Sequence, residues 1–131
     1  MDDAERVLAA NAAFYAAFAG RDADAMDALW AARAPVACIH PGWHILRGRD
    51  PVMASWLAIL SGPASPAIRC ANAVAHVLGD SAFVTCTEHI PGALLVATNV
   101  FVREDGEWRM AHHQAGGVAH IAASDPHEQM H

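Results

Sequence analysis

Histidine is the side chain whose ordinary pKa lies closest to neutral pH, and the chain contains nine of them. One of these, His40, ends the short β-prone run 36–40 and precedes the turn residues Pro41 and Gly42. It could act as a general base if a substrate proton lay against its ring. It could instead be a histidine at a strand end whose ring hydrogen-bonds a backbone carbonyl. The sequence leaves both interpretations open.

Further polar residues fall on strands that we expect to share one face of a sheet. His112 is predicted to lie beside Asn99, where the two could bind or polarise a carbonyl oxygen, or simply form a polar pair between strands. Glu88 on the same face would have a raised pKa if it were desolvated, and could then act as an acid. A salt bridge from Glu88 to Arg69 or Arg49 is the alternative interpretation.

Aromatic residues could form the walls of a pocket for a flat or apolar ligand. Trp43 follows His40 in the same turn and is the best placed of them, whereas Trp30 and Trp56 fall on the apolar stripes of predicted helices, where tryptophan more commonly belongs to the core. His40 and His112 are the candidate catalytic residues. The predicted pocket residues are Tyr15, Trp30, His40, Trp43, Trp56, Glu88, Asn99, His112 and Gln114.

No metal site is expected from the spacing of the histidines. His40 and His44 are four residues apart, but Pro41 and Gly42 between them exclude the helix that would align both rings. His112 and His113 are neighbours on a predicted strand and therefore point to opposite faces. Neither pair provides three converging ligands. The sequence also contains no glycine-rich phosphate loop and no nucleophile elbow, so no cofactor is expected.

Three amphipathic helices are predicted to precede the main sheet. The first is capped by Asp2 or Asp3 and ends at Gly20. The second follows at once, with Asp22 as its N-cap. The third is expected to open at Asp50, with proline at its first helical position, and to end at residues 61–63.

Four extended segments follow, at about 68–78, 81–90, 93–104 and 107–116. They are separated by the two-residue turns Gly79-Asp80, Pro91-Gly92 and Asp105-Gly106, which predict sequentially adjacent antiparallel strands. Helices followed by such a meander indicate an α+β fold rather than repeated βαβ units.

Two-residue turns also set the register, and the register decides which side chains face inward. Glu88 is predicted to pair with Leu95, Phe101 with Met110, and Asn99 with His112. The face with the bulkiest apolar residues should pack on the helices, and it also carries Glu88, Asn99, His112 and Gln114. Burying such groups without partners would cost several kcal/mol, so they should be paired or line a water-accessible cavity.

The opposite face of the sheet is rich in valine and threonine. Such a face is either solvated or packed on another copy of the chain. Its apolar character favours a homodimer formed through Phe83, Thr85, Val96, Thr98 and Val100.

Composition excludes several other functions. The net charge is −6, and all eight basic residues are arginine, so the chain lacks the basic surface that duplex nucleic acid requires. No run of 18 apolar residues predicts a membrane span, and the first residues do not resemble a secretory signal. The three scattered cysteines suggest reduced thiols in a cytoplasmic protein. We expect one domain over residues 1–121 and a flexible tail over 122–131.

Several short motifs, in this order and spacing, resemble the SnoaL-like branch of the nuclear transport factor 2-like (NTF2-like) superfamily. They cover about residues 5 to 116 and lie at 14–18, 21–26, 38–42, 46–49, 78–82, 98–101, 106–109 and 112–113. The resemblance implies a cystatin-like α+β cone, in which three N-terminal helices pack inside a curved antiparallel sheet with a central pocket. It does not specify a reaction, because the superfamily includes isomerases, dehydratases, cyclases and binding modules.

The residues that ketosteroid isomerases use are only partly present. His40 stands where those enzymes place their catalytic aspartate, and Phe14 stands where they place an oxyanion tyrosine. Their second pocket acid would fall near Thr98 and Asn99, and neither residue is an acid. The resemblance therefore does not imply steroid-type isomerisation.

The resulting prediction is a pocket for a small, largely apolar molecule, with the question of catalysis left open. If the protein is an enzyme, cofactor-free isomerisation, dehydration or cyclisation is expected, with His40 as the base and with His112 and Asn99 on the oxygen that gains charge. The alternative is a non-catalytic dimeric module that resembles the association domain of calcium/calmodulin-dependent kinase II.

Overall fold

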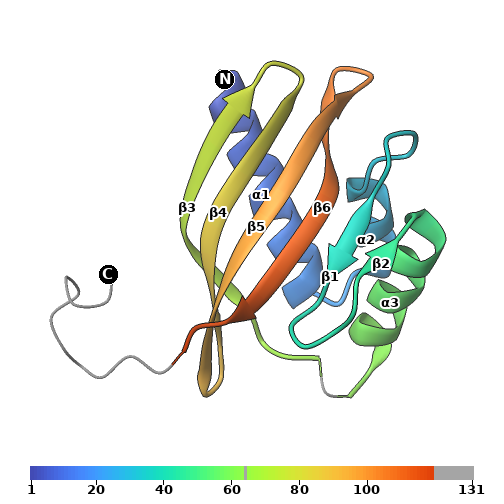
Figure 1. The fold of residues 1–131 in the computed structure, drawn as a ribbon, viewed down its shortest axis with the longest axis vertical. Helices are drawn as coiled ribbons and strands as arrows, with labels where there is room; N and C mark the ends of the chain where they lie inside the picture. Colours follow the sequence, from blue (N-terminus) through green and yellow to red (C-terminus); the bar gives the residue numbers. More distant parts are fainter. Residues whose placement is uncertain (64, 120–131) are drawn as a thin grey trace, which may run out of the picture.

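Helices come first in the chain and long strands last, which confirms the predicted α+β order (Figure 1). The computed structural model describes residues 1–63 and 65–119, so the predicted tail at 122–131 lies outside the described residues. The elements are α1 (Asp3–Ala19), α2 (Ala23–Leu29), β1 (Ala37–Ile39), β2 (Leu46–Arg47), α3 (Arg49–Ser61), β3 (Arg69–Leu78), β4 (Ser81–Ile90), β5 (Ala93–Glu104) and β6 (Glu107–Gly117).

Local sequence signals explain where the first two helices begin. Asp2 caps α1 by accepting a hydrogen bond from the backbone of Glu5 at 2.8 Å, and Asp22 caps α2 in the same way from Ala25 at 3.0 Å. The third helix differs from the prediction. It starts one residue before Asp50, with Gly48 as its N-cap, because the chain reverses at Gly48 with a φ of 91° that favours glycine.

The strands form one six-stranded sheet in the order β2-β1-β6-β5-β4-β3. The long strands β3 to β6 are antiparallel hairpin neighbours, as the turns predict. Strand β1 lies parallel to β6 and carries β2 at the sheet edge. In Figure 1, α1 crosses behind the long strands, while α2 and α3 lie at the end of the sheet formed by β1 and β2.

The predicted register holds along most of the sheet but fails in β6. Glu88 pairs with Leu95 and Phe101 with Met110, as expected. Between Val100 and Phe101 the pairing with β6 shifts, because Ala111 is an extra residue on that strand. The predicted pairing of Asn99 with His112 is therefore wrong, and Asn99 pairs with His113.

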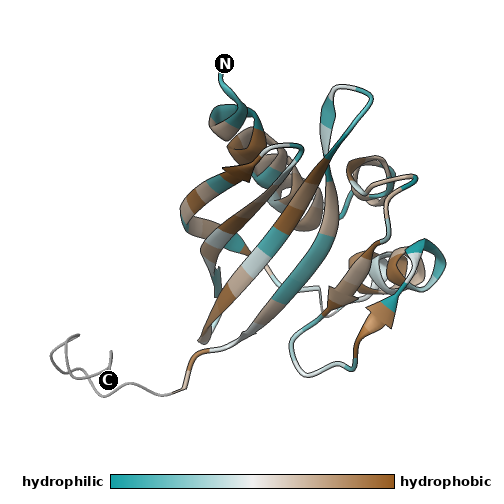
Figure 2. Cartoon of the chain, turned by 45° about the horizontal axis from the view of Figure 1, so that its top comes forward, coloured by the Kyte–Doolittle hydropathy of each residue, from teal (hydrophilic) through white to brown (hydrophobic). Residues whose placement is uncertain are grey.

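The core lies between the helices and the inner face of the sheet. Bands of hydrophobic and hydrophilic residues alternate along the strands in Figure 2, as expected for a sheet with one covered face. The largest fully buried apolar side chains of the core are Trp30, Trp56, Phe14, Phe101, Met26 and Met110. Within this core the polar residues Asn11, Glu88, Asn99 and His113 are almost completely inaccessible.

Candidate functional site

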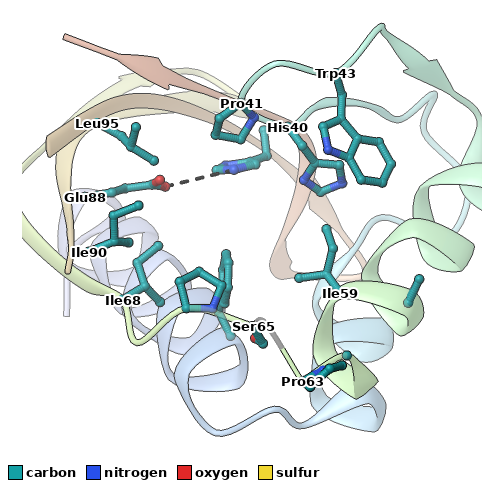
Figure 3. Close-up of a pocket in the computed structure, with 15 residues that line it drawn as sticks. His40, Pro41, Trp43, Ile59, Pro63, Ser65, Ile68, Glu88, Ile90 and Leu95 are labelled. Atoms are coloured by element: carbon teal, nitrogen blue, oxygen red, sulfur yellow. Dashed lines mark ion pairs between the residues drawn. The ribbon is translucent and has the colours of Figure 1, made fainter. Parts of the chain in front are cut away.

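A cavity of about 500 Å³ opens where α1, α3 and the sheet meet (Figure 3). Its walls are mostly apolar. Glu88, Ile90, Leu95 and Ile68 lie along one side, and His40, Trp43 and Ile59 lie along the other. The remaining described lining residues are Phe18, Pro41, Ala58, Gly62, Pro63, Ser65, Pro66 and His113. We call this cavity the pocket; its size and lining are typical of small-molecule sites.

Among the described residues, three titratable side chains line the pocket. They are His40, Glu88 and His113, with exposed fractions of 4%, 2% and 2%. Each comes from a different element: His40 follows β1, Glu88 lies on β4, and His113 lies on β6. The ring centroids of the two histidines are 6.4 Å apart, and His113 Nε2 is 4.0 Å from Glu88 Oε2. Proton donors and acceptors thus converge in an otherwise apolar cavity.

The partner of Glu88 is a tyrosine rather than an arginine. The hydroxyl of Tyr15 on α1 donates a hydrogen bond of 2.6 Å to Glu88 Oε2. Burial raises the pKa of the Glu88 carboxyl, and this hydrogen bond opposes the effect. The salt bridge considered from the sequence does not form with Arg49, which instead binds Asp27 and backbone carbonyls near the end of α2. Arg69 is exposed.

His113 belongs to a network of buried amides and hydroxyls. Its Nδ1 lies 2.6 Å from Asn99 Oδ1. Asn99 Nδ2 in turn donates to Asn11 Oδ1 at 2.8 Å and to the Tyr15 hydroxyl at 3.1 Å. Burial, with His40 and His112 nearby, lowers the pKa of His113 to about 3, so its ring is neutral at pH 7.

Because Ala111 is an extra residue, two predicted site residues face away from the pocket. His112 was expected to face the pocket, but its Nδ1 lies 3.0 Å from the backbone oxygen of Ala37 on the neighbouring strand, and it does not line the cavity. Gln114 is exposed and lines a shallow groove on the outer face. Both side chains are displaced to the other face because a bulge reverses the alternation that follows it.

His40 is buried at the pocket wall in a well-defined setting. Its Nε2 lies 2.9 Å from the hydroxyl oxygen of Ser55 on α3, and that hydroxyl donates to the backbone oxygen of Val52 at 2.7 Å. The ring packs edge-on against Trp43 and Trp56, with centroid distances of 4.8 Å in both cases. Burial lowers the pKa of His40 to about 4, so this ring is also neutral at pH 7.

The three predicted tryptophans occupy different environments. Trp43 lines the pocket and keeps 47% of its surface exposed. Trp56 is buried behind His40 and packs on Phe14 and Phe18 rather than lining the pocket. Trp30 is a core residue that forms a bridge to Met110 in β6.

The model of the SnoaL-like domain matches residues 7–119 of this chain. The chain belongs to the SnoaL-like family. A protein from Streptomyces avermitilis described as a proposed dehydratase of the NTF2-like family is 34% identical, with a TM-score of 0.84, and the match covers 90% of this chain and 97% of that one. This similarity confirms the NTF2-like cone that the sequence motifs indicate.

Two other relatives differ in the functions that their names describe. A proposed calcium/calmodulin-dependent protein kinase type II association domain from Thiobacillus denitrificans is 34% identical, with a TM-score of 0.75, over 86% of this chain and 94% of that one. The F-box protein SKIP8 of Arabidopsis thaliana is 27% identical over 111 residues. The match covers 83% of this chain but only 48% of SKIP8, so the SnoaL-like chain spans about half the length of that relative.

Sequence reasoning missed three polar residues of this SnoaL-like site. His113 was assigned to the outer face, and the run Met110-Ala111 of two apolar residues before it is the one local sign that the alternation breaks. Asn11 on α1 and Ser55 on α3 are buried among the apolar residues of their helices. A polar residue within an apolar helical stripe was the one sequence sign that these two side chains need a partner in the core. Their partners, His40 and Asn99, are distant in the chain and could not be read from spacing.

The cysteines of this SnoaL-like chain are poor nucleophiles. Burial raises the pKa of both Cys38 and Cys86 to about 12. It raises the pKa of Cys70 as well. Within residues 1–63 and 65–119, no group of three or more His, Cys, Asp or Glu side chains is placed to hold a metal ion. Over the same residues, no helix is both long and apolar enough to cross a bilayer.

Proposed function

We propose that this SnoaL-like protein binds a small, largely apolar molecule in its pocket and eliminates water from it by cofactor-free acid–base chemistry. The observation that carries the proposal is the convergence of Glu88, His113 and His40 in a cavity whose remaining walls are mostly apolar. Elimination of water needs an acid for the departing hydroxyl and a base for the neighbouring carbon, and both kinds of group line this pocket.

Glu88 is the candidate acid. A carboxyl with a raised pKa keeps its proton to a higher pH than an ordinary glutamate and can transfer it to a departing hydroxyl. The Tyr15 hydroxyl holds Oε2 from the core side. This leaves Oε1 for the ligand, since none of the described residues donates a hydrogen bond to it.

His40 is the candidate base, as the sequence suggests. Ser55 donates its own proton to Val52, so the Ser55 oxygen accepts the Nε2 proton of His40. The lone pair on Nδ1 can then accept a proton; its contact with Cys38 Sγ is long, at 3.9 Å. A pKa of about 4 makes His40 a weak base in the empty pocket. As Glu88 loses its proton, however, the new carboxylate would stabilise an imidazolium in the same cavity.

The proposed step balances without a cofactor. The C–H bond beside a carbonyl breaks and its proton moves to His40, the C=C bond forms, and the C–O bond breaks as Glu88 protonates the departing hydroxyl to give water. Proton return from His40 to Glu88 through solvent restores the site. The relative from Streptomyces avermitilis, itself described as a proposed dehydratase, supports this reaction over isomerisation or cyclisation.

A panel of apolar β-hydroxy ketones tests the proposal, with the conjugated enone followed by its ultraviolet absorbance. We expect turnover of some members, and a loss of kcat of roughly 10²- to 10⁴-fold in Glu88→Gln and in His40→Gln. The matched control Glu107→Gln changes an exposed glutamate outside the pocket and should retain full activity. Full activity in Glu88→Gln, or turnover by neither the wild type nor the control, would overturn the proposal.

A second candidate function is assembly through the outer sheet face. Among the described residues, four apolar side chains are conspicuously exposed there: Val74, Leu78, Leu94 and Val96 at 51%, 63%, 42% and 49%. The predicted interface residues Phe83, Thr85, Val96, Thr98 and Val100 lie on β4 and β5 in the centre of the same face. The similarity to a proposed kinase association domain supports a homodimer formed there.

Sedimentation velocity separates this candidate from a monomer. The wild type should sediment as a dimer, and Val96→Glu should dissociate it by placing a buried, unpaired charge in the interface. The control Leu57→Glu charges an exposed leucine on α3 and should remain dimeric. A dimer that turns over no hydroxy ketone would favour the non-catalytic association module, whereas a monomeric wild type would exclude it.

A further inference from the structure

Hydrogen-bond directions around Asn99 determine the tautomer of His113. The Asn99 amide nitrogen donates to Asn11 Oδ1 and to the Tyr15 hydroxyl, so its oxygen is the atom that faces His113. An amide oxygen only accepts hydrogen bonds, and His113 Nδ1, 2.6 Å away, must therefore carry the ring proton. In the neutral ring the lone pair then sits on Nε2, the nitrogen nearer to Glu88.

The same logic orients the proton of Tyr15. Its oxygen accepts from Asn99 at 3.1 Å, so its hydrogen is available to Glu88 Oε2 at 2.6 Å. Oε2 therefore acts as an acceptor, and a proton on Glu88 resides on Oε1. His113 Nε2 and Glu88 Oε2 are 4.0 Å apart, which is too far for a direct hydrogen bond.

A hydroxyl group complements this arrangement. It can donate its hydrogen to His113 Nε2 and accept the proton of Glu88 Oε1 with the same oxygen. An ether in the same place lacks the donor and leaves Nε2 unpaired in a desolvated site, which weakens binding. A ketone has the same deficiency, since its oxygen only accepts.

Charge restricts the ligand further. Both imidazoles are uncharged at pH 7, and no arginine is among the described residues that line the pocket. At the rim, Arg21 donates to the backbone oxygens of Gly62 and Ser65, at 3.0 and 3.2 Å, and is exposed. A carboxylate ligand would thus be desolvated beside Glu88 without a cation to compensate it.

We infer that the pocket selects uncharged apolar molecules that carry a hydroxyl group, and that this hydroxyl binds between His113 Nε2 and Glu88 Oε1. The inference rests on the proposed function, because it identifies the substrate class of the same pocket. It also makes Asn99 a positioning residue, which acts by fixing the tautomer of His113.

Three probes with the same bicyclic body test the selection: 2-naphthol, 2-methoxynaphthalene and 2-naphthoate. Binding is measured at pH 7 by calorimetry and by the fluorescence of Trp43 and its neighbours. We expect 2-naphthol to bind roughly tenfold more tightly than the ether, which is the usual value of one buried hydrogen bond. The carboxylate should bind more weakly still.

The outcomes distinguish a failure of this inference from a failure of the proposed small-molecule function. Equal affinity for 2-naphthol and its ether, or tighter binding of the carboxylate, overturns the hydroxyl selection and leaves the apolar pocket in place. Binding of none of the three overturns the small-molecule function itself, and this inference falls with it. Preference for 2-naphthol supports both.

Two further measurements assign the preference to His113. In His113→Gln the advantage of 2-naphthol over the ether should shrink to about twofold or less, whereas in His112→Gln, changed at the adjacent position on the outer face, it should persist. Nitrogen-15 spectra of the wild-type imidazoles make the test independent of how the variants fold. Nδ1 of His113 should be protonated and Nε2 bare, and 2-naphthol should shift Nε2; a proton on Nε2 would overturn the inference.

Discussion

The amide oxygen of Asn99 on β5 lies 2.6 Å from Nδ1 of His113 on β6, although 13 residues separate the two in the chain. This contact presents the other ring nitrogen towards Glu88. Asn99 is completely buried and also binds Asn11 and Tyr15, so one amide connects α1 to the two central strands of the sheet. The polar core is therefore part of the scaffold as well as of the site.

Replacing Asn99 with leucine should destabilise the fold severely. The change removes the hydrogen bonds that Asn99 makes to Asn11 Oδ1, to the Tyr15 hydroxyl and to His113 Nδ1 in the core, and we expect the free energy of unfolding to fall by about 3–5 kcal/mol. Urea denaturation measures the loss. Glu107→Gln is the control, because Glu107 is exposed at the start of β6 and lies outside the proposed interface, and its change should stay within about 0.5 kcal/mol. Similar values for both variants would contradict the structural role of Asn99.

Acid should unfold the protein as His40 and His113 become charged. Their pKa values fall from 6.5 in a free histidine to about 4 and about 3 in the fold, so the unfolded chain binds more protons over this range. The stability linked to neutral rings is thus complete above pH 6.5 and is lost as the pH falls towards 4. The shifts of the two histidines correspond to a loss on the order of 6 kcal/mol between pH 7 and pH 4, and the raised pKa of Glu88 opposes part of this loss.

Urea midpoints measured across this pH range check the expected loss. His113→Gln should flatten the dependence, because one of the two buried rings is removed, whereas His76→Gln changes an exposed histidine on β3 and should leave it intact. A stability that does not change between pH 7 and pH 4 would show that neither buried ring resists protonation.

The hairpins of this protein could be predicted from the sequence because their turns carry explicit residue signals. Gly79, Gly92 and Gly106 all adopt positive φ at the tips between β3, β4, β5 and β6, where glycine avoids the steric cost that other residues meet. Combined with the alternation of side chains along a strand, these turns correctly predict that Glu88 and Asn99 face the core.

The orientation of His112 and His113 could not be predicted, because a register derived from a turn holds only as far as the first bulge. The bulge at Ala111 lies where β6 meets a different segment: Trp30 bridges to Met110, and Ala31 donates a backbone hydrogen bond to the oxygen of Met110 at 2.8 Å. That pairing is between residues about 80 positions apart. A tertiary contact of this kind leaves no local pattern in the sequence.

Replacing Glu88 with glutamine should stabilise the protein at alkaline pH while removing the proposed acid. The folded state raises the pKa of Glu88 above its ordinary 4.5, so ionisation of this buried group opposes folding increasingly as the pH rises through that range. Glutamine avoids this cost, and its side-chain oxygen can still accept the Tyr15 hydrogen bond. We expect a gain in the free energy of unfolding at pH 8 that shrinks as the pH falls towards 4.5.

Urea denaturation at these two pH values provides the comparison. Glu107→Gln, at an exposed position, serves as the control and should show no such difference. A Glu88→Gln variant that is less stable at pH 8 than at pH 4.5, relative to wild type, would mean that the carboxylate is stabilised in the fold.

Trp43 and Trp56 both pack edge-on against His40, with ring centroids 4.8 Å apart, yet their replacement by alanine should have different consequences. Trp56 is 1% exposed and supports the core through Phe14 and Phe18, so Trp56→Ala should cost about 3–5 kcal/mol of unfolding free energy. Trp43 is 47% exposed and lines the pocket, so Trp43→Ala should cost less than about 1.5 kcal/mol and weaken binding of 2-naphthol roughly five- to tenfold. Urea denaturation and calorimetry give the two values. Unchanged affinity in Trp43→Ala would place the ligand away from the wall that Trp43 and His40 form.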